Sequence, residues 1–103
     1  MDSGEYSVVF DEEAAKELGD FGKADRQVFA RAIKRLCKDR RACNATRMKG
    51  ASVPLWRAWA NRDLRVIYEL NTKERLIRIL SVQKKREDTY DDIKKWEKRV
   101  KQW

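Results

Sequence analysis

The first forty residues combine one short apolar stretch with two segments of helical periodicity. Residues Tyr6–Phe10 (YSVVF) are rich in β-branched and aromatic side chains, which predicts a strand. Asp11 then offers a helix N-cap followed by two acidic residues, and this predicts a helix to about Leu18. Gly19 and Gly22 bracket a turn, after which a second amphipathic helix is expected. Its apolar positions are Val28, Phe29, Ala32, Ile33, Leu36 and Cys37.

Beyond residue 40 the period of the apolar positions changes to two. A connector rich in turn formers, RRACNATRMKGASVP, comes first. Three predicted strands follow it: Trp56–Ala60, Leu64–Leu70 and Leu76–Val82. Because short turns join these strands, they should form an antiparallel meander. Thr89 can then start a last helix, in which Ile93, Trp96 and Val100 share a face.

The predicted order of elements is β-α-α-β-β-β-α. Helices segregated from a mostly antiparallel sheet are typical of a small α+β domain. A chain of 103 residues has room for one such domain, so residues 1–103 are interpreted as a single unit. Its core should span about residues 5–95, and a basic C-terminal helix should cover about residues 89–102.

The charge of the chain is large and unevenly distributed. The sequence contains 25 Lys and Arg against 17 Asp and Glu, a net charge of +8. Residues 1–20 carry seven acids and one base, so residues 21–103 carry ten acids and 24 bases, a net charge of +14. This excess favours a polyanionic partner, although basic solubility is the plain alternative. An acidic N-terminus and the lack of a long apolar run indicate a cytoplasmic protein with no membrane partner.

The chain contains no histidine, and this narrows the chemistry that is open to it. Cys37 and Cys43 are six residues apart, so neither a zinc site nor a Cys-His nucleophile pair is predicted, and no metal or other cofactor is expected. Both cysteines are interpreted as reduced thiols, with Cys37 in a helix core. Proton transfer must therefore fall to Lys, Tyr, Asp or Glu, with Arg stabilising charge.

One face of the predicted meander gathers cations and aromatic rings. Arg57 and Trp59 alternate with Trp56 and Ala58, so they point to the same side of their strand. Arg65 lies on the next strand, and a basic run followed by a tyrosine closes the third: Lys84, Lys85, Arg86 and Tyr90. Cations for phosphates beside rings for unstacked bases are what a cleft for single-stranded RNA needs.

Several stretches together resemble the RelE/ParE superfamily of bacterial toxins from toxin–antitoxin pairs. They are MKG, LWRAW, RDLRVIYEL and LIRILSVQKKREDTY, and with the order of elements the resemblance covers about residues 5–95. The RelE branch implies a metal-independent endoribonuclease that cuts mRNA in the ribosomal A site. In that reaction a ribose 2′-OH attacks its own neighbouring phosphate. The ParE branch implies a gyrase poison without nuclease chemistry.

The resemblance also implies roles for individual residues. Arg57 matches a family lysine, Arg65 the phosphate-binding arginine, Lys85 an arginine near the strand end, and Tyr90 the tyrosine that stacks the base. These four are the candidate catalytic residues, and the candidate RNA-binding residues are Lys49, Trp59, Lys84 and Arg86. Two departures stand out, because Trp59 replaces a frequent lysine and Lys85 cannot form the bidentate fork of arginine, a role left open to Arg86.

The function predicted from the sequence is therefore that of a RelE-like mRNA interferase. The alternatives are a ParE-like gyrase inhibitor and an inactive homologue that only binds RNA or an antitoxin. The predicted partners are the ribosome, mRNA and a cognate antitoxin, with no small-molecule cofactor. The antitoxin is expected as an acidic segment that folds on contact, packing on the apolar positions Ile93, Trp96 and Val100 of the last helix.

Overall fold

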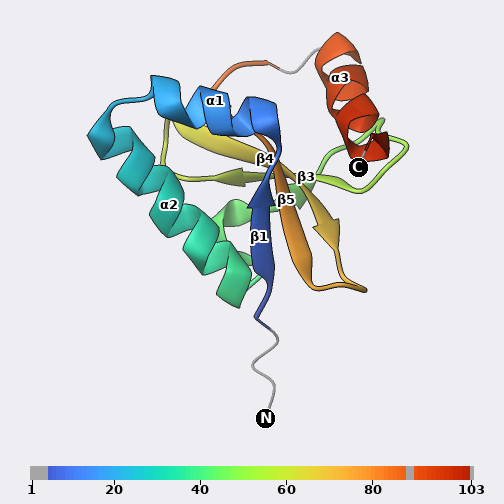
Figure 1. Cartoon of the computed structure of the whole chain (residues 1–103), viewed down its shortest axis with the longest axis horizontal. Coiled ribbons are helices and arrows are strands. Elements are labelled where there is room, and N and C mark those ends of the chain that lie inside the picture. The colour runs from blue at the N-terminus through green and yellow to red at the C-terminus, as the bar shows by residue number, and fades with distance from the viewer. Residues whose placement is uncertain (1–4, 88–89, 103) are drawn as a thin grey trace.

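A five-stranded sheet carries the fold, with two helices packed on one face and a third on the other (Figure 1). The computed structural model describes residues 5–87 and 90–102, without the side chain of Tyr90. The helices are α1 (Glu12–Asp20), α2 (Lys23–Lys38) and α3 (Tyr90–Lys101), and a 3-10 turn, η1, covers Ala42–Asn44. The strands are β1 (Ser7–Phe10), β2 (Thr46–Arg47), β3 (Leu55–Trp59), β4 (Leu64–Asn71) and β5 (Leu76–Lys84).

The sheet has the order β1-β5-β4-β3-β2, with β1 parallel to β5 and the other pairs antiparallel. The predicted α+β class, the element order and the meander are confirmed. The predicted cap at Asp11 is confirmed too, because its carboxylate accepts a hydrogen bond from the Glu13 amide at 3.1 Å. The predicted cap at Thr89 lies outside the described residues.

The connector between α2 and β3 holds structure that the sequence did not reveal. It contains η1 and the two-residue edge strand β2, which pairs with β3 through Thr46 opposite Arg57 and Arg47 opposite Trp56. Strand β5 also continues two residues past the predicted end at Val82. These polar additions extend the sheet toward the predicted site.

Helices α1 and α2 cover the larger apolar face of the sheet. Phe29 and Leu36 of α2 are fully buried there, against sheet residues such as Val66 and Ile79. The predicted inward position of Cys37 is confirmed, since only 8% of it is exposed. Helical spacing therefore placed this face of α2 correctly.

Helix α3 covers the opposite face with a smaller cluster. Trp96 is 2% exposed and packs with Leu55, Ile67 and Leu80, and Ile93 and Val100 add to the same contact. These apolar positions share a face, as predicted, but that face is occupied by the protein's own sheet. The expectation that an antitoxin packs on them is therefore wrong for this conformation.

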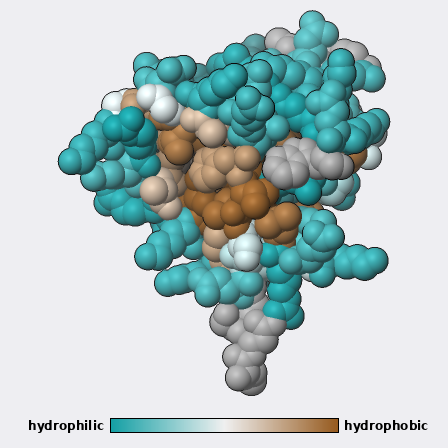
Figure 2. Space-filling model, in the orientation of Figure 1, coloured by the Kyte–Doolittle hydropathy of each residue, from teal (hydrophilic) through white to brown (hydrophobic). Residues whose placement is uncertain are grey.

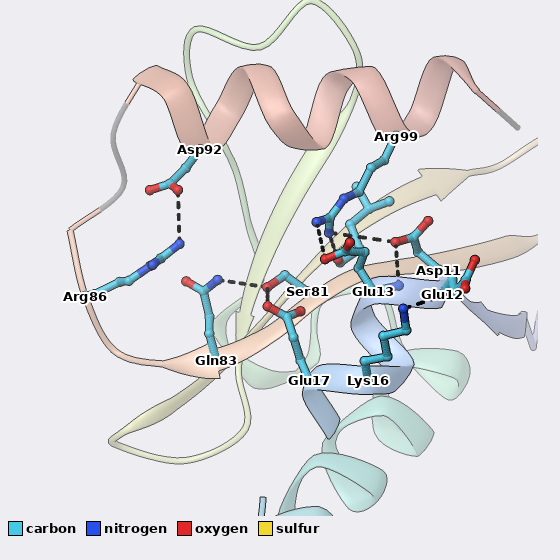
Figure 3. A network of polar contacts seen from close by, with 11 residues as sticks. Asp11, Glu12, Glu13, Lys16, Glu17, Ser81, Gln83, Arg86, Asp92 and Arg99 are labelled. Atoms are coloured by element: carbon cyan, nitrogen blue, oxygen red, sulfur yellow. Dashed lines mark hydrogen bonds and ion pairs between the residues drawn. The ribbon is translucent and has the colours of Figure 1, made fainter. Parts of the chain in front are cut away.

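Polar contacts join α3 to β5 and to the start of α1, and Figure 3 shows those with α1. The Arg99 guanidinium donates to the Leu80 carbonyl at 2.9 Å, pairs with Glu13 at 3.0 Å and lies 3.7 Å from Asp11. One arginine thus ties α3 to β5 and to the start of α1. Within residues 5–87 and 90–102, no helix is long and apolar enough to cross a membrane.

Candidate nucleic-acid interface

Trp59, at the end of β3, is the centre of the predicted site. The Arg57 guanidinium carbon lies 5.9 Å from the centre of the Trp59 ring, so the predicted pairing of cation and aromatic on one face is confirmed. Across the sheet, Trp59 is the register partner of Arg65, and Arg65 is the register partner of Gln83 on β5. Cross-strand partners share a face. Strands β3, β4 and β5 therefore bring Arg57, Trp59 and Arg65 together.

Arg65 is buried, with only 1% of its surface exposed. Its Nε donates to Gln83 Oε1 at 2.8 Å, and one of its terminal nitrogens donates to the same oxygen. Gln83 Nε2 donates in turn to Ser81 Oγ at 2.9 Å, and Ser81 donates to Glu17 of α1 at 3.2 Å (Figure 3). A directional chain of hydrogen bonds thus runs from the buried cation to a carboxylate, and it fixes the Gln83 amide.

A cavity of about 530 Å³ opens beside Trp59, between α2, η1 and the β3–β4 turn. Three cations from three separate elements reach it: Arg35, Arg62 and Lys85. Its other lining residues are Cys43, Asn44, Trp59 and Asn61. No carboxylate lines this cavity within the described part of the chain, so its electrostatic potential is positive.

Two further cavities flank it. One, of about 460 Å³, lies along β2 and is lined by Arg47, Lys49 and Arg57 together with three uncharged residues. The other, of about 560 Å³, shares Asn61 and Lys85 with the central cavity and adds Lys84, together with two carboxylates, Asp25 and Asp63. The contact between Arg57 and Trp59 joins the cavity along β2 to the central cavity. Asn61 and Lys85, which line both, join the central cavity to the third one.

We call this continuous surface the basic belt. It consists of Arg35, Arg47, Lys49, Arg57, Trp59, Asn61, Arg62, Lys84 and Lys85. Five of the eight residues proposed from sequence belong to it, and Arg65 lies buried beside it. A row of cations with an aromatic ring at its centre is the arrangement that tracks a single strand of nucleic acid.

Arg86 and Tyr90 complete the predicted set. Arg86 turns toward α3 and pairs with Asp92 at 3.1 Å, with 53% of its side chain still exposed. It lines none of the three cavities of the belt. The proposed roles of the Tyr90 ring lie outside the described residues.

The hydroxyl of Tyr68 and the thiols of Cys43 and Cys37 stay protonated at neutral pH. Burial raises the pKa of the Tyr68 hydroxyl above its ordinary value, and it also raises the pKa of the Cys43 and Cys37 thiols. Cys43 donates instead to the Ala32 carbonyl at 3.7 Å. None of these three groups is therefore suited to accept a proton at neutral pH.

The sequence did not single out several residues that the fold brings to the site. Arg35, Arg62 and Asn61 line the central cavity but were not among the candidate residues proposed from the sequence. Ser81 lies in the predicted strand Leu76–Val82 and Gln83 lies one residue beyond its predicted end, and neither was proposed as a site residue. Gln83 shares the face of Arg65 because of the register between β4 and β5, which the sequence alone does not show.

The fold matches solved RelE toxins. A chain of the archaeal RelE–RelB complex from Pyrococcus horikoshii is 27% identical, over 78% of this chain and 94% of that one, with a TM-score of 0.65. The RelBE2 toxin–antitoxin complex from Mycobacterium tuberculosis matches at 16% identity, over 79% and 99%, with a TM-score of 0.70. The isolated E. coli RelE toxin matches at 21% identity, over 87% and 96%, with a TM-score of 0.64. No protein-family model and no curated protein matches the sequence.

Fold and site together define a small α+β domain with a basic, aromatic-centred surface. More particularly, the chain has the RelE fold and is RelE-like over most of its length. The resemblance inferred from the sequence motifs is thereby confirmed. Function belongs to the site rather than to the fold, so the chemistry needs its own argument.

Proposed function

We propose that this protein is a RelE-like toxin that cleaves mRNA on the ribosome without a metal, by attack of a ribose 2′-OH on the adjacent phosphate. The 2′-OH loses its proton as the P–O2′ bond forms, the P–O5′ bond breaks and the leaving 5′ oxygen is protonated, which leaves a 2′,3′-cyclic or 3′-phosphate and a 5′-OH. The single observation that carries the proposal is the basic belt, in which cations flank Trp59 on both sides. Unstacked bases pack on an aromatic ring while neighbouring cations hold the phosphates. The neighbouring RelE structures support the toxin class.

The belt offers three kinds of assistance to this reaction. Stacking on Trp59 orients the strand, which aligns the tethered 2′-OH with its phosphate. Arg57 and Lys85, which reach the surface, stabilise the negative charge that grows on the phosphorane. Arg65 acts through its buried positive charge, because the Gln83 contact keeps its guanidinium beneath the surface.

Cleavage of mRNA on programmed ribosomes tests the proposal directly. Lys85→Gln keeps a similar length and removes the charge, so it should lower the single-turnover rate by roughly 10²-fold while ribosome binding changes much less. Lys73→Gln is the matched control, since Lys73 is exposed in the β4–β5 turn at the other end of β4, and it should cleave at the parental rate. EDTA should leave the parental rate unchanged. Equal rates for both variants, or inhibition of gyrase supercoiling without cleavage, would refute the nuclease.

Salt dependence tests the phosphate contacts independently of cleavage. If three to five cations of the belt contact phosphates, log K for single-stranded RNA should fall with log salt at a slope of roughly −2 to −3.5. Arg57→Gln should reduce that slope by roughly 0.7, the share of one contact. An affinity that does not change with salt would exclude the belt as a phosphate track.

We assign the cognate antitoxin to a second surface, the groove between β1 and α2. The groove has a volume of about 650 Å³ and is mostly apolar, lined by Tyr6, Val8, Phe10, Leu18 and Ile33 among others. Figure 2 shows its apolar residues as a brown area framed by hydrophilic side chains. Lys34 and Glu5 also line the groove, and β1 is an edge strand of the sheet. The apolar face of an amphipathic segment complements such a surface.

A substitution that fills the groove should prevent antitoxin binding without unfolding the protein. Ala30 lines the groove from an exposed position of α2, so Ala30→Arg should obstruct it. Ala24→Arg, also exposed on α2 but outside the groove, is the control. Co-purification with the product of a neighbouring small open reading frame should fail for Ala30→Arg and persist for Ala24→Arg. If both variants retain the antitoxin, this groove is not its binding site.

A further inference from the structure

The central cavity of the basic belt is far richer in hydrogen-bond donors than in acceptors. Arg35, Arg62 and Lys85 supply only donors. Two carboxamides, Asn44 and Asn61, complete the polar lining. The chemical preference of the cavity therefore depends on which end of each carboxamide is available to a ligand.

The carboxamide of Asn61 has a fixed orientation. Its Oδ1 accepts hydrogen bonds from the backbone amides of Asp63 and Leu64, both at 2.8 Å. Only oxygen can accept two N–H groups, so the geometry identifies the oxygen and the nitrogen of this amide. The Nδ2 group alone is left for a ligand. Asn61 thus acts in the cavity as a donor.

Asn44 reaches the cavity from a backbone held in the left-handed region. Cys43 and Asn44 have φ values of 60° and 52°, a conformation uncommon for residues other than glycine. The Cys43 thiol anchors this turn to the Ala32 carbonyl of α2. Two consecutive left-handed residues are maintained beside the cavity, as is common where a backbone serves a site. Because Asn61 Oδ1 is already occupied, Asn44 Oδ1 is the one strong side-chain acceptor that the described lining residues leave to a ligand.

We infer that the central cavity holds one base of the bound RNA strand against Trp59 and prefers a keto base, guanine or uracil, over adenine or cytosine. Guanine and uracil present carbonyl acceptors where adenine and cytosine present an exocyclic amino group. An amino group that faces arginine, lysine and the Asn61 Nδ2 leaves donors opposed to donors, which weakens binding. The inference rests on the proposed function only in taking RNA as the ligand.

Binding of short oligonucleotides tests the preference without requiring cleavage. Labelled pentanucleotides of uridine and of cytidine carry the same phosphates and differ at the base edge, so the ratio of their Kd values isolates base recognition. Fluorescence anisotropy should give a uridine preference of about fivefold to tenfold for the parental protein. An inosine and an adenosine pentamer should repeat it for purines. Equal Kd values within each pair would overturn the inference.

The exchange Asn61→Asp tests the residue responsible. A carboxylate still accepts from the amides of Asp63 and Leu64, which preserves the turn, but it replaces the free donor with an acceptor. The ratio of the uridine and cytidine Kd values should therefore fall to about one or reverse. General repulsion of phosphate cancels in that ratio.

Strand β4 supplies a matched control at its other end. Asn71 Oδ1 accepts from the Glu74 amide at 2.9 Å, so Asn71→Asp makes the same exchange in a turn remote from the cavity. This variant should keep the parental ratio. If Asn61→Asp and Asn71→Asp give the same ratio as the parent, Asn61 does not read the base and the inference fails.

The outcomes separate this inference from the proposed function. If the protein shows a uridine preference that responds to Asn61→Asp but does not cleave mRNA on ribosomes, the base pocket is supported and the nuclease activity is refuted. If the protein cleaves mRNA but the Kd ratios show no base preference, the nuclease activity is supported and the base pocket is refuted.

Discussion

The two faces of the sheet are stabilised by different physics. Toward α1 and α2 the buried residues are apolar, with Phe29, Leu36 and Ile79 fully enclosed. Toward α3 only four buried hydrophobic residues form the cluster. The buried polar residues of the described chain belong to this second face or to α3 itself: Arg65, Ser81, Gln83, Glu97 and Arg99.

This difference separates the scaffold from the working surface. Apolar packing is non-directional and tolerates variation as long as volume is conserved. Buried hydrogen bonds, by contrast, fix specific atoms in place and are costly to break. Arg65, the cross-strand partner of Trp59, is held by the second kind of contact, which is what a site needs in order to hold its geometry.

The largest expected effect lies on the apolar face. Phe29 is fully buried and makes an edge-on ring contact with Phe21 at 5.0 Å. Phe29→Ala should lower the free energy of unfolding by about 3–5 kcal/mol, because it removes burial and leaves a cavity. Gln27→Ala, at an exposed neighbouring position, should change it by less than about 0.5 kcal/mol. Urea denaturation of both variants measures the difference, and similar midpoints would show that this face is not the main core.

The sequence predicted the apolar face well and the polar face poorly, for a physical reason. Helical spacing alone locates Phe29 and Leu36, because a helix reports its buried side within a few residues. Arginine and glutamine are usually exposed, so the burial of Arg65 and Gln83 depends on a register between two strands. No local pattern contains that register.

The same limit explains the incomplete site. Trp59 and Lys85 were found because they lie in or beside strands with clear alternation. Arg35 and Arg62 come from a helix and a turn, and only the folded chain brings them to one cavity. Strand β2 was missed because two residues are too few to show a period.

The second prediction tests the polar attachment of α3. Arg99 is buried and joins α3 to Leu80, Glu13 and Asp11. Arg99→Met removes the charge but keeps an apolar stem, and it should lower the free energy of unfolding by about 2–3 kcal/mol. The effect should not be larger, because Glu13 is exposed and its pair with Arg99 is therefore weak. Amide hydrogen exchange should rise across α3 while α2 stays protected.

Lys98→Met, at an exposed position of α3, is the control for that experiment and should leave exchange unchanged. If Arg99→Met increases exchange equally in α2 and α3, the two faces unfold as one unit. The distinction between an apolar scaffold and a polar attachment would then not hold for stability.

The third prediction concerns a polar atom of the apolar face, the hydroxyl of Tyr68. The Tyr68 hydroxyl is buried and has no hydrogen-bond partner among the described residues. Tyr68→Phe should therefore leave stability unchanged or raise it by up to about 1 kcal/mol. Burial raises the folded-state pKa of Tyr68 above 10.0, so the parent should lose stability relative to Tyr68→Phe as the pH rises above that value. A clear loss of stability in Tyr68→Phe at neutral pH would contradict this account.

The smallest effect is expected at the polar edge of the α3 face, where Glu97 accepts hydrogen bonds from the Ser52 amide and hydroxyl. These hydrogen bonds lower the pKa of Glu97 below its ordinary value of 4.5. A carboxyl group whose pKa is lowered in the folded state stabilises the fold above its unfolded pKa, and this contribution is lost as the pH falls through the lower, folded value.

The contact joins α3 to the loop between β2 and β3, so acid should loosen that loop before it affects α2. Thermal midpoints measured between about pH 3 and pH 7 should fall with acid slightly more in the parent than in Glu97→Gln, which cannot titrate. Parallel pH profiles for the two proteins would show that the Ser52 contact contributes nothing to the stability of this face.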